Sequence, residues 1–300
     1  MKKSNTGLSS IFSISEEMIR GNGEDCFYHE AKGNKFIIAA LDGCGGSGAK
    51  KYENFSGKTG AYIASRAVCG GIKAWFSESS KGEDLMKYVQ KALTVCKNYA
   101  DQSGKIMGSL SKAFPTTAAI IVGEAGKDKL SATCYWAGDS RCYLLDANGL
   151  HQLTADDLEG QDAMSNLTND GVMTNVINAS TQFTIHAKKI VLDKPCVLLT
   201  ATDGCFGYLN SPMEFEYLLT VAMQNASSIY GWKKYINEHI NGIAGDDYTL
   251  CAAVWGYDSF DDIKNSMVNR HTFVSNNYIN TDKDINSLWN VYKKEYSAYL

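Results

Sequence analysis

Acidic side chains stand beside apolar, strand-like runs at several widely separated places in this sequence. Asp42 and Asp203 each follow such a run, and a glycine that permits a sharp turn comes directly after each of them. Asp246 shortly precedes another apolar run, and Glu24 and Asp25 precede a shorter one. A carboxylate fixed at a strand end beside a glycine-rich turn suits a hard cation, because backbone carbonyls and water can approach the same ion.

A single Asp-Gly pair is weak evidence of a site, since it is also typical of ordinary turns. The recurrence of the arrangement is stronger evidence. If the strands belong to one sandwich, their ends can converge on a single cleft, and ligands that offer only oxygen favour Mg²⁺ or Mn²⁺ over zinc. Carboxylates crowded together repel one another unless cations neutralise them, so the sequence predicts bound metal.

A predicted hairpin brings the first of these acids together. Residues 26–41 have the pattern of two strands joined by a turn at Gly33. Glu24 and Asp25 precede one arm of the hairpin, and Asp42 ends the other. The three carboxylates are therefore expected to be neighbours in space.

The elements that must position these acids alternate between strands and helices. Strand patterns cover residues 8–16, 116–123, 130–137, 142–146, 183–192, 196–202 and 249–255, and helical patterns cover residues 56–76, 83–99, 213–224 and 228–243. Residues 158–180 are polar and are interpreted as a loop or flap. Hairpin-connected strands followed by pairs of helices predict an α+β fold. We expect four layers, αββα, in which a central antiparallel β-sandwich is flanked by helix pairs.

The sequence predicts a boundary near residue 256. Residues 1–256 contain the strands, the helix pairs and the acids, and are expected to form one domain. Residues 257–300 are polar, rich in Asn and Asp, and end in an amphipathic stretch at 285–299. We expect a helical extension packed on that domain; a partner-binding segment is the alternative.

Bulk composition excludes several classes of function. The chain has 300 residues, of which 44% are hydrophobic, enough for one large core or two modest ones. With 29 basic and 33 acidic residues, it lacks the basic face that nucleic acid requires. No run approaches the roughly 18 apolar residues of a membrane span, and none of the nine cysteines forms a C-x-x-C pair. We expect a cytoplasmic monomer that binds neither nucleic acid nor membrane.

The motifs, taken in order across roughly residues 8–256, resemble those of the metal-dependent, PPM-type serine/threonine protein phosphatases, the protein phosphatase 2C-like family, in its bacterial form. Residues 1–256 would then be the phosphatase domain. The matching segments are RGNGED, LDGCGG, FPTTAAIIV, AGDSRCYLL with LTADD, LLTATDGCFGYL and GDDYTLCAAVW. One such motif is weak evidence, but the whole series in this order is specific.

The resemblance implies a metal-binding role for particular residues. Asp42 would bridge two divalent ions, Mg²⁺ or Mn²⁺. The carbonyl of Gly43 and the Glu24 carboxylate, through water, would complete the shell of one ion. Asp203 and Asp246 would hold the other.

The resemblance also implies a reaction. Asp139 would help Asp203 hold a weaker third ion, as in many family members. Asp25 would orient metal-bound water, and Arg20 would grip the substrate phosphate with its planar guanidinium. A hydroxide bridging two cations would then hydrolyse phosphoserine and phosphothreonine in phosphorylated proteins, without a covalent phosphoenzyme.

Some positions depart from the family pattern. Cys44 stands where many eukaryotic relatives have a histidine proposed as general acid, so we expect a metal-bound water to donate that proton. Gly23 and Asp247 stand where relatives often have asparagine. One alternative is therefore a catalytically silent member that acts as a regulatory or binding module, although the retained ligands argue against it. Another is a metal phosphoesterase with a small-molecule substrate.

Overall fold

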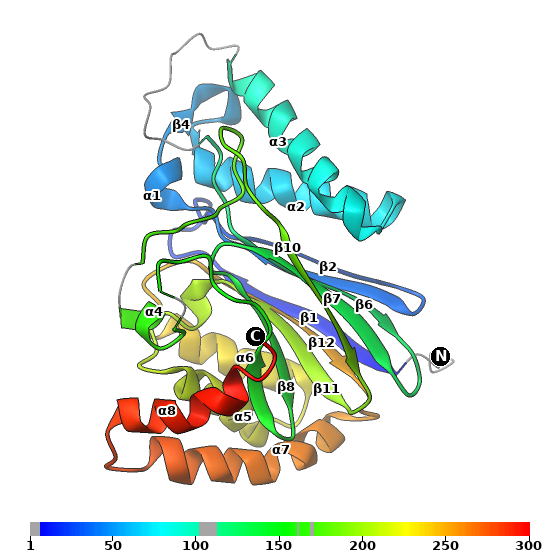
Figure 1. Cartoon of the computed structure of the whole chain (residues 1–300), viewed down its shortest axis with the longest axis vertical. Coiled ribbons are helices and arrows are strands. Elements are labelled where there is room, and N and C mark those ends of the chain that lie inside the picture. The colour runs from blue at the N-terminus through cyan, green and yellow to red at the C-terminus, as the bar shows by residue number, and fades with distance from the viewer. Residues whose placement is uncertain (1–6, 102–112, 161, 169–170) are drawn as a thin grey trace.

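Two five-stranded antiparallel sheets form the centre of the protein, and helices cover their outer faces (Figure 1). The computed structural model describes residues 7–101, 113–160, 162–168 and 171–300. The first sheet has the order β1 (Leu8–Glu16), β12 (Tyr248–Trp255), β11 (Cys196–Ala201), β8 (Arg141–Asp146) and β9 (Gly149–Gln152). The second has the order β10 (His186–Leu192), β7 (Leu130–Ala137), β6 (Ala118–Ala125), β3 (Lys35–Leu41) and β2 (Cys26–Lys32). This is the predicted αββα arrangement.

The helices lie in two outer layers (Figure 1). Helices α2 (Gly60–Glu78) and α3 (Leu85–Asp101) cover the second sheet. The first sheet is covered by α5 (Pro212–Asn225), α6 (Ile229–Asn241), α7 (Phe260–Val274) and α8 (Ile285–Tyr296). The shorter elements include α1 (Gly45–Gly48), β4 (Lys51–Tyr52), β5 (Lys58–Thr59) and α4 (Ser165–Thr168). None of these helices is both long and apolar enough to traverse a lipid bilayer.

The central strands are apolar without interruption because both of their faces are buried. In β3, Phe36 and Ile38 face the space between the two sheets, while Ile37, Ala39 and Leu41 pack with the residues of α2 and α3. Strands that are covered on both faces have continuous apolar sequences instead of alternating ones. The same construction in β11 fixes the strand end that precedes the second Asp-Gly pair.

Most predicted elements are confirmed, with ends that differ by a few residues, but the first helix begins later than expected. The helix predicted from residue 56 begins at Gly60, because β4 and β5 pair as a small hairpin just before it. The chain turns between them through Ser56 and Gly57, both of which have positive φ. Thr59 caps α2 by accepting a hydrogen bond from the Tyr62 N–H at 3.1 Å. Lys58 and Thr59 of this hairpin contact the loop that carries Glu24.

Helix α7 lies within the predicted helical extension, residues 257–300, but its bounds were not predicted because an arginine interrupts its apolar face. Ile263, Met267, Arg270 and Val274 are its buried positions. Arg270 Nε and Nη2 donate to the carboxylate of Glu216 at 2.5 and 3.0 Å. Glu216 lies on α5 and is fully buried, so this ion pair joins α7 to the helical layer through the protein interior.

Replacing Arg270 by methionine should destabilise the protein strongly. The substitution leaves the fully buried Glu216 without its cation, and removing one partner of a buried pair typically costs about 3–5 kcal/mol. Urea unfolding at neutral pH would measure this change. Lys293→Met is the matched control, because it breaks a partly exposed pair with Asp162 and a weak contact with the Trp289 ring, and should cost about 1 kcal/mol or less. Equal effects of the two variants would contradict the prediction.

Candidate metal centre and active site

The predicted acids lie at strand ends of both sheets, where the charges of several of them act on Asp42. Asp42 follows β3, and it feels the charge of acids that follow β11, precede β12, precede β2 or lie between β7 and β8. Burial, followed by these like charges, raises its pKa well above the usual range. The acids that act on it are Asp203, Asp25, Asp139 and Asp246. Asp42 therefore lies within electrostatic range of these four acids.

The glycine after each aspartate allows the backbone to pack closely. A Cβ on Gly43 would lie 2.5 Å from the Ala61 carbonyl oxygen, and one on Gly204 would lie 2.0 Å from the Asp247 carbonyl oxygen. Any side chain at either position would displace main chain. The need for glycine here comes from close approach and not from a positive φ.

The loop that carries Glu24 is tied to the far side of the site. Asp247 accepts hydrogen bonds from the backbone N–H of Glu24 at 2.6 Å and of Met18 at 2.7 Å. Arg66, on α2, donates to the Gly23 carbonyl at 2.9 Å. The Glu24 carboxylate accepts from the Thr59 hydroxyl. Burial raises the pKa of Glu24, and the nearby acids 246 and 247 add to this rise.

Asp25 is the most deeply placed of the acids in this loop. It is buried, and the Thr202 hydroxyl donates to its Oδ2 at 2.8 Å. Burial, with smaller contributions from the charges of Asp203 and Asp247, raises its pKa well above the usual range. Sequence reasoning did not identify Thr202 as a partner, because a threonine inside an apolar strand end carries no signal of a function.

Asp139 provides a specific indication that a cation belongs here. Its Oδ1 is buried and has no hydrogen-bond partner among the residues that the structure describes. Burial, and then the charges of Asp203 and Asp156, raises its pKa to about 8. A buried carboxylate oxygen without a partner is costly. A divalent ion ligated by oxygen would remove that cost, so the residues present fit such a group.

The acids do not form a closed metal shell as they stand. Across residues 7–101, 113–160, 162–168 and 171–300, no three Asp, Glu, His or Cys side chains lie close enough to ligate one ion. The individual ligand roles therefore stay predictions.

Arg141 and Asp156, which belong to the predicted motifs, have a structural role. The Arg141 guanidinium donates to both carboxylate oxygens of Asp156, at 2.9 and 2.6 Å, and both side chains are buried. Its positive charge also lowers the pKa of Asp139 and Asp203, against the larger opposing effects. Asp157 instead accepts from the Gly138 N–H at 2.9 Å. Asp156 and Asp157 therefore both have hydrogen-bond partners that give them a structural role.

Arg20 is exposed and makes no hydrogen bond or ion pair with any residue that the structure describes. It lies at the outer end of the same loop, after Ile19 and before Gly21. Its guanidinium is therefore available to an anionic ligand.

Two cavities border the acids. One, of 450 Å³, is lined by Asp139 and Asp203 together with residues 158, 166, 167 and 171 from the predicted flap. The other, of 440 Å³, is lined by Glu24, Asp246 and Lys58, among others. A substrate could reach the acids from either cavity.

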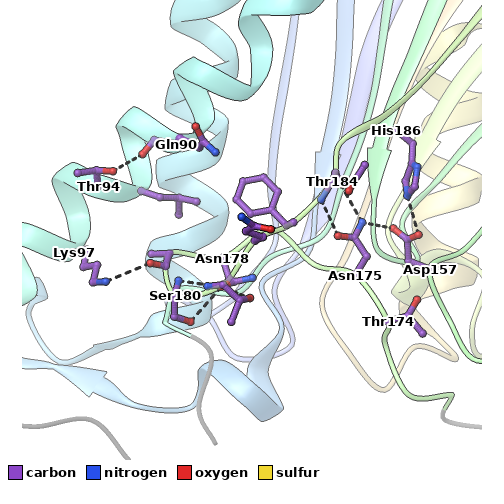
Figure 2. A pocket seen from close by; sticks show the side chains of 15 residues that line it. Gln90, Thr94, Lys97, Asp157, Thr174, Asn175, Asn178, Ser180, Thr184 and His186 are labelled. Carbon is purple, nitrogen blue, oxygen red and sulfur yellow. Dashed lines mark hydrogen bonds and ion pairs between the residues drawn. The ribbon is translucent and has the colours of Figure 1, made fainter. Parts of the chain in front are cut away.

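A larger cavity of 890 Å³ lies away from these acids, between α3 and residues 174–186 (Figure 2). None of the predicted site residues lines it. Asn175 and His186 both contact the Asp157 carboxylate there, at 2.6 and 2.9 Å (Figure 2). Those contacts satisfy Asp157 and anchor the end of the loop, so we do not place the chemistry in this cavity.

Comparison of the fold with solved structures gives consistent matches. A bacterial serine phosphatase matches with a TM-score of 0.61 and 18% identity, over 83% of this chain and 98% of that one. The serine/threonine phosphatase Stp1 from Staphylococcus aureus matches with a TM-score of 0.61 and 17% identity, over 81% and 94%. The catalytic domain of the phosphatase PstP, in complex with two manganese ions, matches with a TM-score of 0.54 and 17% identity, over 82% and 97%.

Sequence comparison identifies the family. No curated protein matches the chain significantly. A family model described as Protein phosphatase 2C matches residues 22–237, which is most of the sequence and includes the acids that precede β2 and those that follow β3 and β11. The chain belongs to the protein phosphatase 2C family, and thus to the serine/threonine phosphatases.

Proposed function

We propose that the chain removes phosphate from phosphoserine and phosphothreonine in proteins, with Mg²⁺ or Mn²⁺ as cofactor. The observation that carries this proposal is the position of Asp42. It follows a buried strand and lies within the field of Asp203, Asp25, Asp139 and Asp246. Two manganese ions in the structure of PstP support a site of this kind.

The acids divide naturally between two ions. Asp42 would be shared, with Glu24 and the Gly43 carbonyl on one ion, and Asp203 and Asp246 on the other. When bound, the two cations would make water a stronger nucleophile and would neutralise the charge on the phosphate oxygens.

A third ion would be held by Asp139 together with Asp203. This ion would be bound more weakly, because Asp203 would already serve another ion. The second ligand would be Asp139, whose Oδ1 lacks a partner among the described residues.

The remaining roles belong to the protein. Asp25 is held by the Thr202 hydroxyl and would accept a hydrogen bond from the attacking water, which orients that water. Arg20 would donate to phosphate oxygens in a fixed planar fork. In-line attack requires that the phosphate be held in one orientation, and a bidentate guanidinium provides this.

Replacing Arg20 by alanine should weaken substrate capture more than it slows turnover. Hydrogen bonds to charged groups contribute about 1.5–3 kcal/mol, so we expect kcat/KM on a phosphothreonine peptide to fall roughly 10- to 100-fold, mainly through KM. Steady-state phosphate release measures this. Arg20→Lys keeps the charge but not the fork, and should recover only part of the loss. An unchanged KM in Arg20→Ala would remove Arg20 from the site.

The proposed function is tested by phosphate release from a phosphothreonine peptide with Mn²⁺, with Mg²⁺ and with a chelator. Activity that requires the cation supports the proposal. Absence of both activity and divalent-ion binding in calorimetry would favour the silent regulatory module. A preference for small phosphate esters over phosphopeptides in a substrate panel would favour the small-molecule phosphoesterase.

A further inference from the structure

The β4–β5 hairpin lies between the glycine-rich turn after Asp42 and helix α2, and its last two residues both contact the acidic loop, residues 17–25. Lys58 Nζ donates to the Gly21 carbonyl, and to Asn22 Oδ1 at 3.2 Å. The next residue donates its hydroxyl to Glu24. The hairpin therefore supports the loop at its outer end and at its metal-ligand end.

Other side chains hold the inner part of this loop. Asp247 accepts from the Glu24 N–H, and Arg66 donates to the Gly23 carbonyl. Asp247 also accepts from the Met18 N–H at 2.7 Å, and Arg66 lies 3.8 Å from a carboxylate oxygen of Glu17. Neither of them contacts residues 19–22. There the Glu17 carboxylate accepts from the Gly21 N–H, and Lys58 donates to the Gly21 carbonyl.

The outer end is a tight turn. Asn22 N–H donates to the Ile19 carbonyl at 2.9 Å, and Gly21 has a φ of +81°, in the left-handed region. Arg20 lies inside this turn and makes no polar contact with a described residue, so its direction is set by the backbone. Lys58 donates to the carbonyl of Gly21, the residue directly after Arg20.

Lys58 is itself held in place. Its ammonium lies 4.6 Å from the centre of the Tyr62 ring, a cation–π contact that restricts a normally flexible side chain. Thr59, the N-cap of α2, fixes the hairpin end to the helix. Lys58 is therefore held by its contacts with Tyr62 and by the hairpin that Thr59 joins to α2.

We infer that Lys58 is a positioning residue, which holds the turn 19–22 so that Arg20 points toward the phosphate. The inference rests on the proposed function, because it assigns Lys58 an effect through Arg20. Lys58 need not touch the substrate. Without the Lys58 ammonium, the turn would move more freely and the Arg20 side chain would adopt a wider range of orientations.

The first test is a pair of substitutions in the same hairpin. Lys58→Met should raise KM for a phosphothreonine peptide about three- to tenfold, since one hydrogen bond contributes about 0.5–1.5 kcal/mol, and should leave kcat nearly unchanged. Lys51→Met is the matched control, because Lys51 lines the same cavity but its ammonium makes no polar contact with a described residue. Lys58→Arg should restore most of the affinity. Equal losses in both methionine variants would indicate a general charge effect and overturn the inference.

The second test is a double-mutant cycle with Arg20. If Lys58 acts through Arg20, Lys58→Met should have little effect in an Arg20→Ala background, whereas independent effects would add. Hydrogen exchange should also show faster exchange of the Gly21 and Asn22 amides in Lys58→Met.

The outcomes separate the two proposals. Additive kinetics or unchanged exchange, in an enzyme whose Arg20→Ala variant behaves as expected, would overturn the role of Lys58 alone. A wild-type chain that hydrolyses no phosphopeptide would overturn the proposed function, and this inference with it.

Discussion

Replacing Asp203 by asparagine should abolish phosphatase activity and leave a folded protein. Asp203 begins the short turn after β11, and its charge acts on Asp42, Asp25 and Asp139. In the proposed site it serves one of the paired ions and the third ion. Loss of a single preorganised electrostatic group costs about 10²–10³ in kcat, and loss of a shared metal ligand should cost at least roughly 10³.

Phosphate release at saturating Mn²⁺ would measure this loss, and circular dichroism would confirm folding. Asp247→Asn is the matched control, because it removes an equal charge from the same cluster. In our assignment Asp247 binds the Glu24 and Met18 amides and no ion, so the substitution should cost no more than about 10–100-fold, as for other supporting residues of metal sites. If Asp203→Asn keeps activity above that of Asp247→Asn, our assignment of the ligands is wrong.

The main features of the fold could be predicted from the sequence because they depend on local patterns. The uninterrupted apolar runs of β3 and β11 indicate strands buried on both faces, and the hairpin 26–41 follows from its turn. The bounds of helix α7, within the predicted helical extension, could not be predicted because its inward face includes Arg270. Its buried partner Glu216 lies 54 positions away in the sequence, on α5. No local pattern can indicate such a pair.

The same limit applies to the candidate site. Its acids could be found because an aspartate followed by glycine at a strand end is a recurring local signal. The groups that hold those acids give no such signal. Thr202 directly follows the last residue of β11, where a threonine is common, and Lys58 and Arg66 are residue types found at many surface positions. Their roles depend on which loops meet in three dimensions.

The second large effect concerns stability in the absence of metal. Burial is the leading cause of a raised pKa at Asp42, Asp25, Asp203 and Asp139, and in the last case the pKa rises to about 8. An acid whose folded pKa exceeds its unfolded value, about 4 for aspartate, favours the folded state while it is protonated. That contribution is fully present below the unfolded pKa, and is lost as the pH rises through the folded pKa. The metal-free protein should therefore lose stability from this site between about pH 4 and pH 8.

Divalent cations should restore this stability mainly at high pH, because they compete with protons for the same oxygens. A ligand at 100 times its Kd adds about 2.7 kcal/mol, and each kcal/mol raises the Tm of a protein of this size class by about 2–4 °C. We therefore expect Mg²⁺ to raise the Tm by roughly 5–10 °C at pH 8. At pH 5 the protonated acids bind little metal, so the shift should be much smaller.

Comparing the metal-induced shift at the two pH values isolates the site, because groups elsewhere titrate equally with and without metal. Asp162, for example, has its pKa lowered to about 2 by a hydrogen bond from Lys293 and other donors, against an opposing effect of burial, and it cancels from the difference. Asp139→Asn supplies an internal control. It removes a buried charge that lacks a partner among the described residues, so it should raise the metal-free Tm at pH 8 but not at pH 5. Equal metal-induced shifts at both pH values would show that these acids do not form the cation site, since protons and cations would then not compete there.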